Sequence, residues 1–114
     1  MDIVDARIPA PTGGASTAQA EMTLGGTTGP DTLRAASSPA ARAVVFTSDG
    51  NAVRQIAIPL ADGSSLSTGP PNFDRILLTG LRRRLRVGQM VTITLVFARA
   101  GRATLQIPVT PPVP

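Results

Sequence analysis

The chain contains no histidine and no cysteine, and its only aromatic residues are three phenylalanines. Without cysteine it has no disulfides or thiolate sites, and the redox compartment stays undetermined. Without histidine it lacks the commonest general base at neutral pH and the commonest protein ligand of zinc and copper. Because aromatic side chains are so few, the hydrophobic core has to be aliphatic. These absences argue against an enzyme that relies on a nucleophile–base pair and against a histidine-based metal centre.

Long apolar runs are also missing, since no window holds the roughly 18 consecutive apolar residues that a membrane span needs. The chain opens Met-Asp-Ile-Val-Asp, with acidic residues where a secretory leader would be basic, so we expect no signal peptide. The protein is then either cytosolic or a mature form with an added methionine. Lysine is absent, and 11 arginines against seven acidic residues give a net charge of +4. Guanidinium groups pair with phosphate, although a GC-rich genome also explains an all-arginine set.

The clearest structural signal is an alternation of apolar and polar residues with a period of two over 91–97 and again over 104–109. A short polar turn, 99–102, joins the two segments, so the sequence predicts a β-hairpin with one core-facing side. Pro108 cannot donate a hydrogen bond to a ladder, which predicts that the second arm is an edge strand or ends there.

Shorter segments with strand character precede this hairpin, separated by turns rich in glycine, proline, aspartate and serine. We expect strands at 3–8, 18–24, 33–36, 43–46, 53–60, 66 and 76–79. Only 32–42 could form a helix, and Pro39 interrupts it. The sequence therefore predicts an all-β fold, an antiparallel sandwich or barrel. We expect one domain over 1–109 and a loosely held proline-rich tail over 110–114.

Several segments, taken in order, resemble the periplasmic copper chaperone A family. The resemblance rests on Asp-Ala-Arg-Ile-Pro-Ala-Pro-Thr-Gly-Gly at 5–14, Ala-Glu-Met-Thr-Leu at 20–24, Asp-Thr-Leu-Arg-Ala-Ala-Ser-Ser-Pro at 31–39, Ile-Pro-Leu-Ala-Asp-Gly at 58–63, Leu-Thr-Gly-Leu at 78–81, and Val-Thr-Ile-Thr-Leu-Val-Phe at 91–97 with Ala-Gly at 100–101. It implies a cupredoxin-like β-sandwich with an immunoglobulin-like Greek key. It also implies a periplasmic location and delivery of Cu(I) to respiratory oxidase through a protein partner.

The resemblance also implies four copper-ligand positions, and all four are substituted here. The family has a His after the Ser-Ser-Pro turn, a Met about a turn later, and a His-x-Met pair before Gly-Leu. The corresponding residues are Phe46, Arg54 (in the stretch 52–54), Arg75 and Leu77. Cu(I) prefers thioether and imidazole donors, and an arginine has no lone pair to offer. We therefore expect the chaperone's fold without its metal site and without a cofactor.

The remaining candidates have alternative explanations. We expect Met22 and Met90 to pack in the core, because methionine commonly fills gaps there. The arginine run, Arg82, Arg83, Arg84 and Arg86, would form a positive patch for an acidic partner, phosphate or an anionic membrane, but a solvated loop explains it as well. No aromatics interleave with it, so we expect no nucleic-acid binding.

Three functions follow, none of them enzymatic. The first is a degenerate family member that acts as a binding or accessory protein, as a monomer or weak dimer. The second is a working Cu(I) carrier that uses non-standard or partner-supplied ligands. The third is a binding module for acidic partners through the arginine run.

Overall fold

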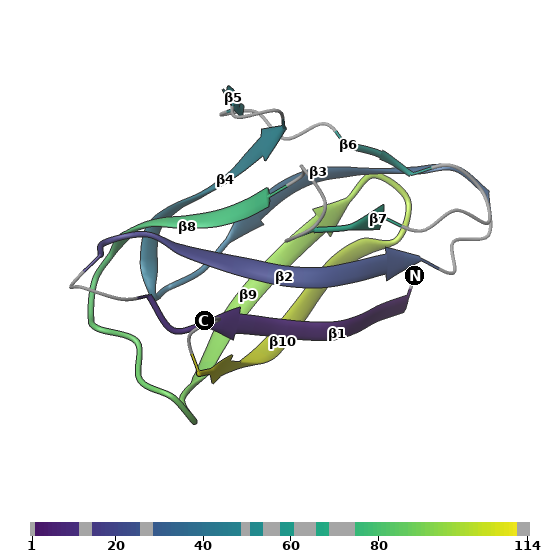
Figure 1. The fold of residues 1–114 in the computed structure, drawn as a ribbon. Coiled ribbons are helices and arrows are strands. Elements are labelled where there is room, and N and C mark those ends of the chain that lie inside the picture. The colour runs from purple at the N-terminus through teal and green to yellow at the C-terminus, as the bar shows by residue number, and fades with distance from the viewer. Residues whose placement is uncertain are drawn as a thin grey trace.

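The computed structural model describes residues 2–11, 15–25, 29–48, 51–53, 58–60, 66–68 and 75–111. All of its regular elements are strands (Figure 1), so the predicted all-β fold is confirmed, and residues 32–42 contribute to two strands on either side of Pro39 instead of a helix. No helix in the described part is long and apolar enough to cross a bilayer. The strands are β1 (Asp2–Pro9), β2 (Ala18–Gly25), β3 (Asp31–Ser37), β4 (Ala41–Ser48), β5 (Asn51–Val53), β6 (Ile58–Leu60), β7 (Leu66–Ser67), β8 (Arg75–Leu81), β9 (Met90–Phe97) and β10 (Gly101–Thr110).

The strands form one continuous sheet in the order β5-β4-β8-β2-β1-β10-β9-β3-β6, with β7 beside β2. The sheet curls so that its two halves face each other (Figure 1). The join between the halves is a parallel pair, β1 with β10, in the register Ile8↔Val109 and Pro9↔Thr110. Each of the other pairs in this order is antiparallel. The antiparallel prediction thus holds except at the seam that connects the first strand to the last.

Apolar and polar residues alternate along the strands, so each half of the sheet contributes one row of apolar side chains to a shared core. In β9 the side chains of Val91, Ile93, Leu95 and Phe97 are all at most 3% exposed, as the period of two predicts. Ile76 and Leu78 of β8 face them from the other half and belong to the same cluster. Burial of aliphatic rows from both halves, with each side chain contributing about 1.5–3 kcal/mol, is what holds the curled sheet closed.

Two strand predictions are wrong in detail. The single strand expected over 53–60 is two short strands, β5 paired with β4 and β6 paired with β3, at opposite ends of the strand order. The second arm of the hairpin neither ends at Pro108 nor lies at an edge, since β10 continues to Thr110 between β9 and β1. Val109 donates its N–H to the Gln89 carbonyl (2.8 Å), so by alternation the Pro108 nitrogen points away from β9. The missing N–H therefore costs no bond to that strand.

Candidate functional site

The outer face of β4 and β8 carries two of the four positions that the family resemblance assigns to copper, Arg75 and Leu77. The two strands are antiparallel in the register Val45↔Leu77 and Thr47↔Arg75. Directly opposed side chains on one face of such a pair have Cβ atoms about 4.5–5.5 Å apart. Arg75 and Leu77 are two residues apart on β8, so they share this face with Val45 and Thr47. All four are half-buried.

Phe46 does not belong to this group. It pairs with Ile76, and both side chains are buried, Phe46 at 9% exposure and Ile76 at 1%. The structure thus brings Arg75 and Leu77 together and places Phe46 on the opposite side of the sheet, because adjacent residues of a strand point to opposite faces. Arg54, the fourth predicted position, lies outside the described residues.

These four residues offer hydrocarbon, one hydroxyl and one guanidinium. Val45 and Leu77 have no donor atom, and the Arg75 side chain has no lone pair to donate. Elsewhere in the described part of the chain, no three side chains of His, Cys, Asp or Glu lie close enough to hold a metal ion. The described soft donors are the two thioethers of Met22 and Met90.

The two methionines differ in environment. Met22 is 2% exposed and belongs to the core, as predicted. Met90 is 52% exposed, so its predicted core position is wrong. The reason is register: Val91 faces inward, and the residue before it therefore points outward.

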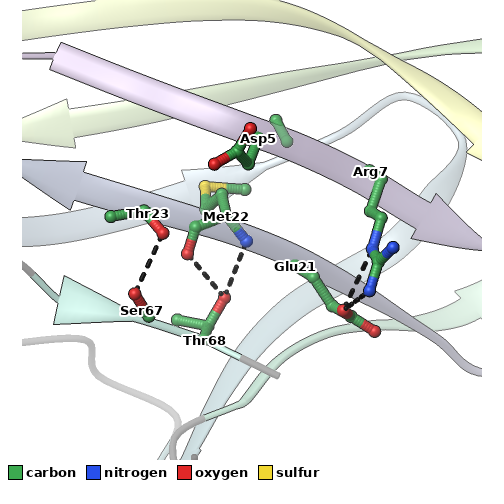
Figure 2. A pocket seen from close by; sticks show the side chains of 8 residues that line it. Asp5, Arg7, Glu21, Met22, Thr23, Ser67 and Thr68 are labelled. Atoms are coloured by element: carbon green, nitrogen blue, oxygen red, sulfur yellow. Dashed lines mark hydrogen bonds and ion pairs between the residues drawn. The ribbon is translucent and has the colours of Figure 1, made fainter. Parts of the chain in front are cut away.

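A hollow of about 420 Å³ lies between β1, β2 and β7 (Figure 2). A β-bulge in β1 helps to form it, since the register with β2 shifts by one residue between Val4 and Arg7. Asp5, within the bulge, has φ of 55°, a left-handed conformation that Asp tolerates better than most residues. Arg7 donates from Nε and Nη2 to Glu21 Oε1 at 3.2 and 3.0 Å across the hollow. The sequence showed no sign of this bulge, because no glycine marks it.

Thr68 lines the same hollow and completes the hydrogen bonding of β2. Strand β2 pairs with β8 up to Ala20 and with β7 from Thr23 on, which leaves a gap between them. In that gap the buried Thr68 hydroxyl accepts from the Met22 N–H and donates to the Ala20 carbonyl, each at 3.2 Å (Figure 2 shows the contacts with Met22). The Thr68 N–H donates to the Met22 carbonyl at 2.9 Å. The hydroxyl and the N–H of Thr68 beside the hollow are therefore both used in hydrogen bonds to β2.

Asp31 organises the turn between β9 and β10. Its Oδ1 accepts from the N–H groups of Thr32 and Arg99 at 2.8 Å, and its Oδ2 accepts from that of Ala100 at 2.9 Å. Burial raises the pKa of the Asp31 carboxyl, but the hydrogen bonds from Arg99, Thr32 and Ala100 and the charge of Arg99 outweigh it, so the pKa is lowered. Asp31 is therefore a structural carboxylate that stays ionised.

The predicted arginine run lies in the connection between β8 and β9. Arg82, Arg83, Arg84 and Arg86 are all exposed, whereas Leu85 between them is only 4% exposed. Three of the arginines, with Ser16 and Leu81, line a hollow of about 250 Å³. The four arginines of the run thus lie together on the surface, and three of them border a hollow.

Comparison with known proteins supports the family assignment. The sequence profile of the family described as "Putative lipoprotein LpqE-like" matches residues 1–109. The copper-bound PCuAC domain from PmoF2 is 28% identical, with a TM-score of 0.84, over 96% of this chain and 92% of that domain. Cu(I)-bound DR1885 from Deinococcus radiodurans is 29% identical, with a TM-score of 0.69, over 94% of this chain and 74% of that one. Among curated proteins, none matches the chain.

The apo PCuAC domain from PmoF1 also shares the fold, with a TM-score of 0.85 at 21% identity. The resemblance to copper chaperone domains, with their cupredoxin-like architecture, is thus confirmed from the sequence profile and from the arrangement of the strands. The chain belongs to the LpqE-like family and has the copper-chaperone-like PCuAC fold.

Proposed function

We propose that this protein is a non-enzymatic, copper-chaperone-like binding or accessory protein of the periplasm that does not hold Cu(I) in its family's site. The observation that carries the proposal is the outer face of β4 and β8. The family resemblance assigns a His-x-Met pair to Arg75 and Leu77 there, and the facing residues are Val45 and Thr47. None of the four is a soft donor.

Electrostatics adds to the missing donors. A guanidinium keeps its positive charge at any physiological pH. Coulomb repulsion acts between this charge and a second positive charge placed close to it. A Cu(I) ion on this face would therefore gain no donor from Arg75 and would be repelled by it.

The rest of the proposal concerns location and partners. The description of the family as a lipoprotein, and the copper chaperone domains that share its fold, support a periplasmic location and contact with a protein partner in copper delivery. Copper chaperone domains carry a metal and release it, which supports a role without catalysis. We propose that the molecule acts as a monomer or weak dimer.

Titration with Cu(I) in a reducing buffer, with a competing chelator, tests the proposal directly. We expect no stoichiometric site of submicromolar affinity in the native chain. A single site of that affinity would overturn the degenerate assignment and restore a copper carrier.

A gain-of-function variant tests the geometry itself. V45H/R75H/L77M places two imidazoles and a thioether on one face, so we expect it to bind one equivalent of Cu(I) at least about 100-fold more tightly than the native chain. F46H/R75H/L77M is the matched control, because its new imidazole would point to the opposite side of the sheet. Circular dichroism checks that both variants fold. Equal binding by the two would show that the β4–β8 register is not what positions the ligands.

A Cu(I) carrier with non-standard or partner-supplied ligands is the second candidate, and one observation favours it. Met90 is 52% exposed and offers a thioether at the surface. One thioether leaves the other coordination positions of Cu(I) to a partner. If this candidate is right, M90L abolishes copper uptake in the presence of that partner, whereas loss of uptake by M22L but not by M90L would contradict it.

A further inference from the structure

The connection between β8 and β9, together with the first residue of β9, combines charge with exposed hydrocarbon. We call residues 82–90 the basic tip. It carries Arg82, Arg83, Arg84 and Arg86, followed by two apolar side chains that are more than half exposed, Val87 at 56% and Met90 at 52%. Figure 1 shows this connection projecting beyond the ends of β9 and β10.

The basic tip is anchored at both ends by backbone hydrogen bonds. Arg82 donates its N–H to the Ala40 carbonyl at 3.0 Å, and Gly88 donates to the Val109 carbonyl at 2.9 Å. Just before the tip, Leu81 donates to the Ser16 carbonyl at 2.9 Å. In its middle, Leu85 is 4% exposed and belongs to the core cluster. The loop therefore presents its arginines from a fixed base and loses little freedom on binding.

The arginine side chains are available for a ligand. Between described residues, no hydrogen bond or ion pair uses the guanidinium of Arg82, Arg83, Arg84 or Arg86, and the described salt bridge joins Arg7 to Glu21. The first three of these arginines line the 250 Å³ hollow beside Ser16. A guanidinium pairs bidentately with phosphate oxygens, and the hollow is large enough for one phosphate group. The favoured ligand chemistry is thus a phosphate-bearing anion.

The two exposed apolar side chains favour a membrane surface over a small dissolved anion as the ligand. A dissolved phosphate would leave Val87 and Met90 in water, whereas a bilayer would bury them at the level of the headgroups. Basic residues next to exposed aliphatic ones are the combination that binds proteins to anionic membranes, where hydrophobic burial adds to electrostatic attraction.

We propose that the basic tip docks the protein on an anionic phospholipid surface, with the arginines on lipid phosphates and with Val87 and Met90 inserted among the headgroups. This inference is independent of the proposal that the family's copper site is lost, because none of the residues in the β4–β8 face takes part in it, and it shares only Met90 with the second candidate function. It would place the domain against a membrane by contact rather than by a span.

Vesicle co-sedimentation tests the docking. We expect the native chain to bind phosphatidylcholine vesicles containing about one-third phosphatidylglycerol and not vesicles of phosphatidylcholine alone. Binding should weaken as salt rises from about 0.05 to 0.3 M. Equal binding to the two kinds of vesicle, or binding to neither, would overturn the proposal.

Two pairs of variants separate the parts of the basic tip. R83Q/R84Q should weaken partitioning by about 25-fold, at about fivefold for each charge. R34Q/R102Q, which removes two exposed arginines from β3 and β10, should weaken it much less. V87S/M90Q should lower partitioning by at least about tenfold, and V4S, at an apolar residue that is 50% exposed on β1, should not. Equal losses for the two arginine pairs would mean that net charge, not the tip, drives binding, and equal losses for V87S/M90Q and V4S would mean that the apolar side chains of the tip do not insert.

Inorganic phosphate distinguishes a free anion from a lipid. Chemical shifts of the tip amides are followed as phosphate is added, without vesicles. Weak binding that competes with anionic vesicles supports a shared phosphate subsite in the hollow. Tight phosphate binding by a protein that ignores vesicles would assign the tip to a soluble ligand and overturn membrane docking.

Discussion

At the scale of single residues, Asp31 shows how one carboxylate holds a turn. It satisfies three backbone N–H groups, including those of Arg99 and Ala100 at the far end of β9. Its pKa is lowered from 3.8, so its contribution to folding stability is complete above the unfolded-state pKa and is lost as the pH falls through the folded value.

We therefore expect D31N to reduce the free energy of unfolding at pH 7, because an amide carries no charge and offers only one acceptor oxygen. The gap between the native chain and D31N should shrink as the pH falls below about 4. Denaturant titrations at pH 7 and between pH 4 and 2 measure it. D2N, at an exposed carboxylate on β1, is the control. A gap independent of pH would show that the charge of Asp31 is not responsible.

On the outer face of β4 and β8, the sequence predicted some features of the candidate site and not others. The family resemblance assigns Arg75 and Leu77 to ligand positions, and their spacing of two on a single strand places them on one face. The resemblance also assigns Phe46 on β4, which pairs with Ile76, while the register sets Val45 opposite Leu77. A shift of one residue leaves a motif similar but moves a side chain to the other face. Hydrogen-bond register is a long-range property, so the sequence alone did not determine it.

At the scale of elements, β2 depends on a residue that belongs to no strand. Thr68 provides the hydroxyl that bridges β2 between its partners β8 and β7. Sequence periodicity predicted β2 well because its inward row is apolar. It did not indicate Thr68, since a lone threonine in a turn-rich stretch has no distinctive pattern.

We expect T68V to lower the free energy of unfolding by about 1–3 kcal/mol, because it leaves the buried Met22 N–H without an acceptor. T68S keeps the hydroxyl and loses one methyl group, so it should cost about 0.8 kcal/mol. Chemical denaturation compares them. Equal losses for valine and serine would assign the effect to packing rather than to the hydrogen bonds.

At the scale of the whole molecule, alternation predicted an all-β fold and much of its core. Strands β1, β2, β9 and β10 were expected within a few residues of their observed limits because each has a polar face and an apolar one. The pairing order was not predictable in this way. Strands β5 and β6 come from one apolar stretch, yet they pair with different strands at opposite ends of the order. Local patterns indicate that a segment forms a strand, but they do not indicate which other strand it pairs with.

The parallel pairing of the first and last strands has a mechanical consequence. Strand β1 starts at the end of the molecule away from the place where β10 finishes (Figure 1), and the two strands are in register at Ile8↔Val109 and Pro9↔Thr110. A pull that separated residues 2 and 111 would slide the strands past each other in shear. The bonds of the seam would then share the load instead of breaking one after another. The fold thus resists tension best along the line that joins its two ends.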